Sequence, residues 1–299
     1  MKKTLPLALL VMLLWGSLFP MVKLGYSVCA VSGVYSILLF AGIRFTVCGL
    51  AITLFSAVKN KNDLRFSPKK LPSVFLMGVF AIILHYTCTY IGLTLTDSSK
   101  TALLKQAGAL LYVLFAAFFF KDDRLTLNKL IGVTVGFLGI AVINVGAGGY
   151  SFGLGEILIL LASLCTVFSN VTGKKVYSEV SNIVATGISQ IFGGAVLLAI
   201  GLVGGGRVAF TEPRSFLVFG YVCLASIVSY CIWSALVKSG QLSGLFIIKF
   251  SEPLFACVFG ALILSEDILK WQYLVAFILI SLGITVTHLK PLKNKKSPQ

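Results

Sequence analysis

Ten apolar stretches, each close to the length needed to cross a lipid bilayer, constrain this chain more than any other feature. They lie near residues 4–22, 32–57, 71–93, 99–120, 127–147, 154–174, 183–203, 215–237, 242–264 and 270–289. About 20 helical residues cross ~30 Å of hydrocarbon. The stretches are continuously apolar rather than alternating, which fits helices that satisfy their own backbone and does not fit barrel strands. With 58% hydrophobic and 12% charged residues, we expect an all-α polytopic membrane protein with ten transmembrane helices.

The basic residues indicate the orientation of these helices. The net charge is +15, but Lys and Arg fall in alternate loops instead of forming a patch for nucleic acid, so we expect no nucleic-acid partner. With the N-terminus inside, seventeen of them lie in inner segments and five in outer segments. We therefore expect both termini to be cytoplasmic. We expect the first stretch to remain as a helix, and the short basic tail favours a bacterial inner membrane.

The sequence repeats itself at an offset of 144 residues. The residue pairs that carry the repeat are Tyr86 and Tyr230, Ser99 and Ser243, Lys105 and Lys249, and Gly139 and Gly283. Each half holds five stretches, and because five is odd the second half must enter the membrane with the opposite orientation. We expect two inverted five-helix repeats, residues 1–148 and 149–299, with a substrate site near the midplane where they meet.

Lys105 and Lys249 are the strongest candidates for that site. Lys105 lies about 8 residues below the outer end of its stretch, or ~12 Å, and Lys249 about 9 residues, or ~13 Å, above the inner end of its own. A lysine deep in hydrocarbon costs roughly 2.5 to 3.5 kcal/mol on insertion scales. Snorkelling to the headgroups is the alternative, but the side chain is too short to span that depth comfortably. We predict that both ammonium groups share one cavity.

Several further side chains are predicted near the same level. Arg44 lies in the middle of the second stretch and aligns at an offset of 146 with Gln190; its alternative role is a structural ion pair or hydrogen bond. The remaining candidates are donors and aromatic rings, with helix packing as the alternative for the histidine: His85, Tyr86, Tyr230 and Trp233.

Glu252 is the carboxylate deepest in a stretch, and it leaves two interpretations open. It follows Lys249 by three residues, so the two side chains share a helix face and could form a local ion pair. Alternatively Glu252 loads and releases a proton between two access states. In either case Arg44 and Lys105 leave an excess of positive charge, which favours anionic substrate groups.

Other chemistry has little support in the sequence. The seven cysteines form no C-x-x-C, so we expect packing roles and no metal or cofactor. We find no nucleophile, base and oxyanion set, and we expect no enzyme. Gly132 and Gly136 form a G-x-x-x-G, which indicates close packing within the chain, with a homodimer contact as the alternative. A receptor or scaffold would not need two buried cations at matched depth.

Three segments resemble the drug/metabolite transporter superfamily with paired EamA-type domains. They are LLWGSLFPMVKLG, IRFTVCGLAITLF and FSEPLFACVFGALILSEDILKWQYLVAFILISLGITV. The most specific part is Glu252–Pro253 followed by Glu266; the first half has Ala109 in place of the proline and Asp122 with Asp123 at the acidic end. The resemblance implies a ten-helix carrier of the plasma or inner membrane that moves amino acids, metabolites or drugs.

The chain also resembles, more distantly, the plastid phosphate translocators, which place comparable side chains around a phosphate group. The matching residues are Lys105, Lys249, His85 and Tyr230, whereas Phe250 stands where the translocators have an arginine. We therefore expect a secondary transporter of a small phosphorylated or carboxylated metabolite that works by alternating access and exchange. The alternative is a proton-coupled exporter of cationic or aromatic amino acids or drugs that uses Glu252.

Overall fold

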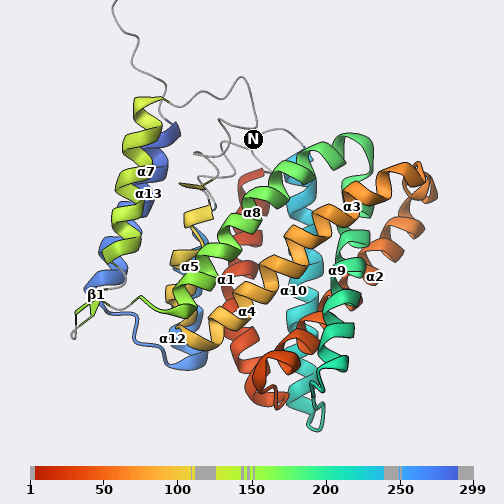
Figure 1. Cartoon of the computed structure of the whole chain (residues 1–299), viewed down its shortest axis with the longest axis horizontal. Helices are drawn as coiled ribbons and strands as arrows, with labels where there is room; N and C mark the ends of the chain where they lie inside the picture. Colours follow the sequence, from red (N-terminus) through yellow and green to blue (C-terminus); the bar gives the residue numbers. More distant parts are fainter. Residues whose placement is uncertain are drawn as a thin grey trace, which may run out of the picture.

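The computed structural model describes residues 4–108, 110–111, 126–142, 145–146, 149–150, 152–238, 249 and 251–288. Within these residues the chain is almost entirely helical, with one two-residue β pairing (Figure 1). The elements are α1 (Thr4–Val28), α2 (Gly33–Lys59), η1 (Lys61–Leu64), η2 (Pro68–Lys70), α3 (Leu71–Gly78), η3 (Val79–Leu84), α4 (His85–Leu95), α5 (Ser98–Leu104), α7 (Leu127–Val142), β1 (Val145–Gly146), β2 (Gly149–Tyr150), α8 (Leu154–Glu179), α9 (Asn182–Val203), α10 (Pro213–Lys238), α12 (Ser251–Leu264) and α13 (Trp271–His288).

The predicted all-α membrane fold is confirmed. Among the described residues six helical segments are long and apolar enough to span a bilayer, and the shorter apolar helices α7, α12 and α13 fall in three more of the predicted stretches. Helix α5 begins the fourth stretch, whose residues 112–120 lie outside the described part of the chain. The fifth stretch was predicted too long, because α7 ends at Val142 and β1 pairs with β2 just beyond it.

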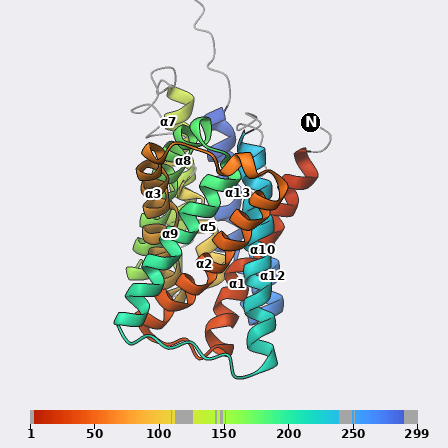
Figure 2. The same ribbon diagram turned by 90° about the vertical axis from the view of Figure 1, so that its right-hand side faces the viewer.

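Helices from the two halves of the chain pack against one another in matching pairs. Figures 1 and 2 show α2 beside α9, and in Figure 1 α7 runs beside α13 at the opposite edge of the bundle. Between these edges α1 packs on α10 and α12, and α8 packs in the same way on α4 and α5. Among the described residues, the contacts named here for helices before residue 149 have counterparts in those named for the helices after it.

Glycines allow the paired helices to approach closely. A Cβ on Gly194 of α9 would lie 2.5 Å from the Thr46 backbone nitrogen of α2. At the other edge a Cβ on Gly283 of α13 would lie 2.6 Å from the backbone nitrogen of Gly136 in α7, with Gly132 also in contact. The G-x-x-x-G of α7 therefore packs against α13 within the chain.

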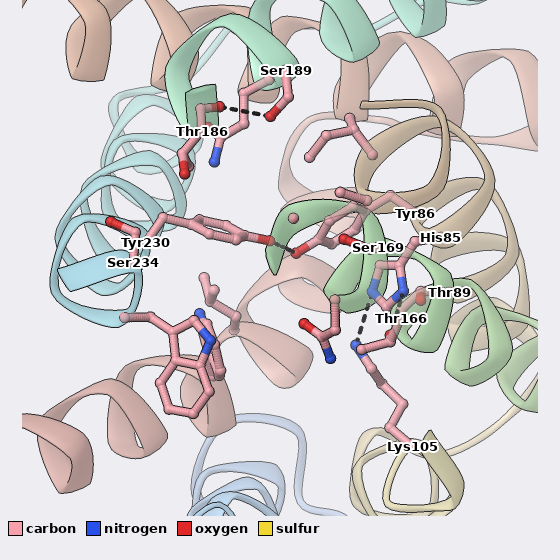
Figure 3. Close-up of a pocket in the computed structure, with 18 of the residues that line it drawn as sticks. His85, Tyr86, Thr89, Lys105, Thr166, Ser169, Thr186, Ser189, Tyr230 and Ser234 are labelled. Carbon is pink, nitrogen blue, oxygen red and sulfur yellow. Dashed lines mark hydrogen bonds between the residues drawn. The ribbon is translucent and has the colours of Figure 1, made fainter. Parts of the chain in front are cut away.

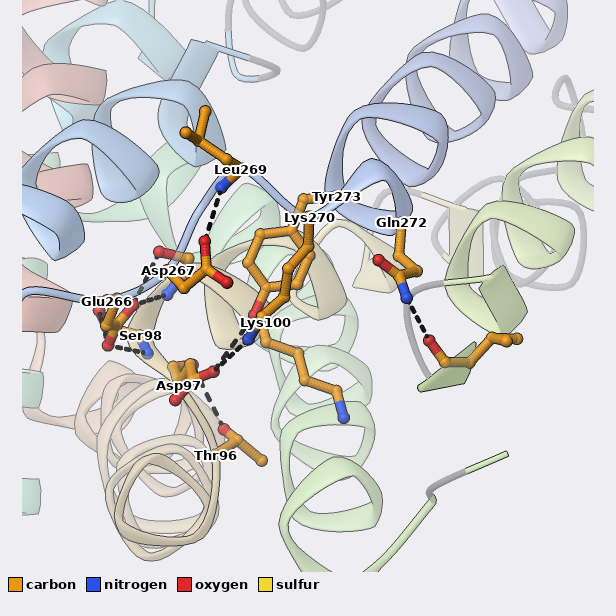
Figure 4. A network of polar contacts seen from close by, with 12 residues as sticks. Thr96, Asp97, Ser98, Lys100, Glu266, Asp267, Leu269, Lys270, Gln272 and Tyr273 are labelled. Carbon is orange, nitrogen blue, oxygen red and sulfur yellow. Dashed lines mark hydrogen bonds and ion pairs between the residues drawn. The ribbon is translucent and has the colours of Figure 1, made fainter. Parts of the chain in front are cut away.

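A polar network closes the end of the bundle at which α12 connects to α13, here called the α12–α13 end (Figure 4). Glu266, in this connection, accepts four hydrogen bonds of 2.7–3.0 Å from the backbone N–H and hydroxyl groups of Ser98 and Ser99. Lys23 of α1 lies 3.8 Å from Glu266 and donates to the Thr96 carbonyl at 2.9 Å. These residues form the Glu266 network, which joins α1 and α5 of the first half to the second half.

The hydrogen bonds also set the charge state of Glu266. Burial alone would raise the pKa of this carboxyl, but the donors on Ser98 and Ser99 outweigh burial and lower the pKa below its ordinary value. Glu266 is therefore an ionised carboxylate near neutral pH, which strengthens each of the bonds it accepts.

Candidate functional site

A cavity of about 530 Å³ lies between the two halves of the chain. Its lining includes Leu18, Val22 and Leu93, all buried, toward the α12–α13 end. Toward the opposite end, where α8 ends and α9 begins, the lining includes Tyr177 and the exposed Ser178. The cavity therefore reaches the surface at this second end, here called the α8–α9 end.

The structure brings all the predicted site residues to the wall of this one cavity. They are Arg44, His85, Tyr86, Lys105, Tyr230, Trp233, Lys249 and Glu252. They come from α2, α4, α10 and the first turn of α12, with Lys105 directly after α5 and Lys249 two residues before α12. Their convergence in one chamber is a matter of geometry, and substrate binding by them remains a prediction.

Lys105 lies where a helix is interrupted. Helix α5 ends at Leu104, and Lys105 and Gln106 form a turn in which Gln106 N–H donates to the Leu103 carbonyl at 3.0 Å, before helix resumes at Ala107. Irregular backbone within a membrane span is tolerated where it lines a cavity, and it is common at transporter sites. The turn leaves the Lys105 side chain on the cavity wall, half-buried.

His85 holds Lys105 in position (Figure 3). His85 follows the π-helical turn η3, another local irregularity that often accompanies functional residues. Its Nδ1 lies 2.9 Å from the Ala162 carbonyl, which can only accept, so this nitrogen carries the proton. Nε2 is then free to accept from the Lys105 ammonium at 3.2 Å. A neutral imidazole thus orients the lysine without cancelling its charge.

Helix α1 places an aromatic ring near each lysine. The Lys105 ammonium lies 5.2 Å from the centroid of Phe19, and the Lys249 ammonium lies 5.8 Å from that of Trp15. Trp15 and Phe19 are one helical turn apart and therefore share a face. Trp233 packs on Trp15 with centroids 5.0 Å apart. Each cation therefore gains attraction to a π face while its charge remains available to a ligand.

Tyr86 and Tyr230, which the repeat aligns, form a hydrogen bond between their hydroxyl groups. Figure 3 shows the two rings meeting in the middle of the cavity, with His85 and Lys105 on one side of the pair and Thr186 and Ser189 on the other. The bond links α4 to α10. It therefore joins the two halves of the chain across the cavity.

Arg44 is 1% exposed and lies among neutral partners. Its Nε and Nη2 both donate to the Ser226 hydroxyl, at 3.1 and 2.5 Å. The rings of Phe45, Tyr86 and Tyr90 surround the guanidinium at 4.8–5.7 Å. The described residues contain no ion pair to Arg44, so its charge adds to the positive potential of the cavity.

Glu252 is 4% exposed, and its Oε2 has no hydrogen-bond partner among the described residues. In the same part of the chain no ion pair joins Glu252 to Lys249, although the two share a helix face. A buried carboxylate oxygen without a partner is costly unless a ligand or a proton meets it. The local ion pair is therefore absent from this conformation.

Sequence reasoning missed several polar groups on the cavity wall. Thr89, Tyr90, Gln106 and Gln190 each line the cavity and carry at least one buried polar atom without a partner in the described residues. Gln190 is the repeat counterpart of Arg44 at an offset of 146 residues. The signal for the others was a polar side chain within an apolar span, which alone does not distinguish a cavity from helix packing.

Comparison with known proteins shows the family to which this chain belongs. The profile of the EamA-like transporter family matches residues 2–145 and again residues 153–289. The chain belongs to the EamA-like transporter family. The resemblance seen in the sequence is thereby confirmed, and this EamA-like chain is a membrane transporter.

Two uncharacterized transporters align with this EamA-like transporter over nearly its whole length. It is 27% identical over 301 residues to the uncharacterized transporter YvbV of Bacillus subtilis, covering 98% of this chain and 94% of the relative. It is 23% identical over 293 residues to the uncharacterized inner membrane transporter YedA of Escherichia coli, covering 96% and 92%. A solved crystal structure, 18% identical, matches 96% of both chains with a TM-score of 0.67, which supports the fold.

Proposed function

We propose that this EamA-like protein is a secondary transporter of a small anionic metabolite, phosphorylated or carboxylated, whose anionic group is bound by Lys105 and Lys249. The observation that carries the proposal is the meeting of two repeat-equivalent ammonium groups in one cavity. Neither has an ion-pair partner among the described residues, and the nearby Arg44 is uncompensated as well. Three cations and one carboxyl, that of Glu252, line the described wall of the cavity, so an anionic ligand supplies the remaining counter-charge.

The same proposal assigns the mechanism and orientation. The units 1–148 and 149–299 are inverted repeats that rock about the cavity, and both termini are cytoplasmic in a bacterial inner membrane. On this assignment the α8–α9 end faces the cytoplasm, and the present conformation is open inward. Reporter fusions to the C-terminus test the orientation: activity of a cytoplasmic reporter is expected, and activity of a periplasmic one contradicts it.

Ligand binding is tested by thermal shift of the purified protein. Phosphate esters and carboxylates should raise the melting temperature, whereas amino acids and quaternary amines should not. Lys105→Gln and Lys249→Gln should each weaken anion binding at least tenfold, because charge-assisted hydrogen bonds are lost. Lys59→Gln is the matched control, since Lys59 is exposed at the end of α2. Equal anion binding by all variants contradicts the proposal.

Exchange follows from the charges. An empty cavity leaves like charges facing each other in a low dielectric, whereas a bound anion neutralises them, so the loaded carrier should reorient more readily. Proteoliposomes loaded with internal substrate should then take up labelled substrate faster than empty ones. Equal uptake excludes obligatory exchange.

One observation favours a second candidate function. The unpartnered Oε2 of Glu252 can take a proton, which supports a proton-coupled exporter of cationic or aromatic amino acids or drugs. This alternative requires Glu252→Gln to abolish efflux driven by a pH gradient while Lys105→Gln and Lys249→Gln retain it. The reverse pattern supports anion transport.

A further inference from the structure

Unmet hydrogen-bonding groups in the cavity indicate more about the substrate than its charge. Gln190 of α9 is 1% exposed and lines the cavity, and neither its amide oxygen nor its amide nitrogen has a partner among the described residues. A buried amide that meets nothing is costly. Both atoms lack partners, so the ligand group that satisfies Gln190 must be able to accept and to donate.

This double requirement separates the chemical classes. A carboxylate or phosphate oxygen accepts from the amide N–H but cannot donate to the amide oxygen, and an alkyl group does neither. An ammonium group donates only, and the excess positive charge that Arg44, Lys105 and Lys249 give to the cavity disfavours it. A hydroxyl group donates and accepts without charge, and therefore fits best.

Other polar groups on the cavity wall that lack hydrogen-bond partners also favour a hydroxyl-bearing ligand. The hydroxyls of Thr89 and Tyr90 lack partners, and so do the acceptor oxygens of Gln106 and Glu252, all on the same cavity wall. Acceptor oxygens require a donor from the ligand, which a bare anion lacks. A hydroxyl-bearing ligand provides both kinds of bond.

The groups near Gln190 are also placed apart from Lys105. In Figure 3 Thr186 and Ser189, which lie within one turn of Gln190 on α9, are separated from Lys105 by the Tyr86–Tyr230 pair. The Ser189 hydroxyl donates to the Thr186 carbonyl at 2.9 Å, which leaves its oxygen able to accept. The α9 wall is thus suited to a second, uncharged part of the ligand.

We propose that Gln190 is a specificity-determining residue that binds a hydroxyl group of the substrate, so that this transporter prefers hydroxyl-bearing small anions to the same anions without hydroxyls. The inference rests on the proposed function, because the lysines are taken to bind the anionic end. It adds the chemical class of the other end of the substrate, which carries a hydroxyl group. Thr89 contributes a second hydroxyl contact.

Matched pairs of probes test the preference. Glycerol 3-phosphate is compared with propyl phosphate, and glycerate with propionate, by equilibrium binding to the full-length protein in detergent. We expect the hydroxylated member of each pair to bind at least tenfold more tightly, since an analogue without the hydroxyl leaves buried polar groups unpaired. Serine is included as the ammonium-bearing probe, and tighter binding of serine than of glycerate overturns the inference.

Gln190→Leu should reduce the ratio within each pair to about threefold or less, chiefly by weakening the hydroxylated member. Folding is not expected to suffer, because the substitution removes an unpartnered buried amide; Thr89→Val offers a second, nearly isosteric variant that should reduce the ratio in the same direction. Gln272→Leu is the matched control, because Gln272 is half-buried outside the cavity and donates a solvent-exposed hydrogen bond to the Val145 carbonyl. An unchanged ratio in both cavity variants overturns the inference.

The two proposals fail in different ways. Loss of all anion binding in Lys105→Gln and Lys249→Gln, with no hydroxyl preference in the parent protein, removes the role of Gln190 alone. Unchanged anion binding in the lysine variants removes the proposed anionic site. A hydroxyl preference that depends on Gln190 would still stand in that case.

Discussion

Two carboxylates at opposite ends of α12 have opposite environments. Glu266, just beyond α12, accepts four hydrogen bonds and has Lys23 nearby, whereas Glu252, in the first turn of α12, has an oxygen without a partner among the described residues. Glu252 is 4% exposed and the Glu266 side chain 7%, so a carboxylate oxygen without a hydrogen-bond partner is costly at either position. The difference indicates that the Glu266 network is structural, whereas the free oxygen of Glu252 is available to a ligand or a proton that binds reversibly.

The contrast also bears on how the halves move. The Glu266 network ties the two halves together at the α12–α13 end, whereas at the α8–α9 end the cavity opens. If the halves rock, the Glu266 contacts must break when the α12–α13 end opens. Variants of the two carboxylates and of the inter-half tyrosine bond can therefore break or sharpen this comparison.

The largest effect is expected from Glu266→Ala. Removing the carboxylate leaves the N–H and hydroxyl groups of Ser98 and Ser99 without their acceptor, and we expect the free energy of unfolding to fall by about 3 kcal/mol. Denaturation in detergent, by heat and by denaturant, measures the change. Asp267→Ala is the matched control, because the exposed Asp267 accepts one bond of 3.2 Å from its own loop. Equal losses in the two variants would remove the structural role of Glu266.

A smaller loss of stability is expected at low pH. The pKa of Glu266 is lowered in the folded protein, since donated hydrogen bonds outweigh burial, so its contribution to stability is present above the unfolded value of about 4.3. That contribution is lost as the pH falls from this value through the folded pKa. The melting temperature should therefore decline below about pH 4, and Glu266→Gln should show a shallower decline. Identical pH profiles would contradict the assignment.

The sequence predicted what depends on local composition and on the repeat. Hydropathy located the six long spans and the shorter helices α7, α12 and α13, and the repeat that pairs Lys105 with Lys249 predicted their shared cavity. The sequence did not predict η3, the turn at Lys105–Gln106 or the short β1–β2 pairing, because tertiary contacts decide whether an apolar segment bends. The carbonyl of Ala162, which fixes the His85 tautomer, and the donors around Glu266 come from distant segments, and composition carries no sign of them.

Glu252→Gln should change stability much less than Glu266→Ala. The substitution relieves the desolvation of a buried carboxyl that has one unbonded oxygen, but it also removes the attraction of this carboxyl to Lys105 and Lys249. Because the two effects oppose each other, we expect the free energy of unfolding to change by no more than about 1 kcal/mol. Denaturation beside Glu266→Gln measures the difference with the same chemical change. A loss as large as that of Glu266→Ala would show that Glu252 is structurally bonded after all, and the comparison would fail.

The smallest effect is expected from the Tyr86–Tyr230 bond. Tyr86→Phe and Tyr230→Phe each remove one hydroxyl at an open cavity, where the remaining hydroxyl can meet solvent, so each should cost about 0.5–1 kcal/mol in the free energy of unfolding. Because the two hydroxyls act on each other, the double variant should cost less than the sum of the single ones. Additive losses would show that the bond contributes nothing. In transport, faster exchange by Tyr86→Phe would mean that the bond restrains movement between the halves, whereas slower exchange would place the hydroxyls among the groups that bind substrate.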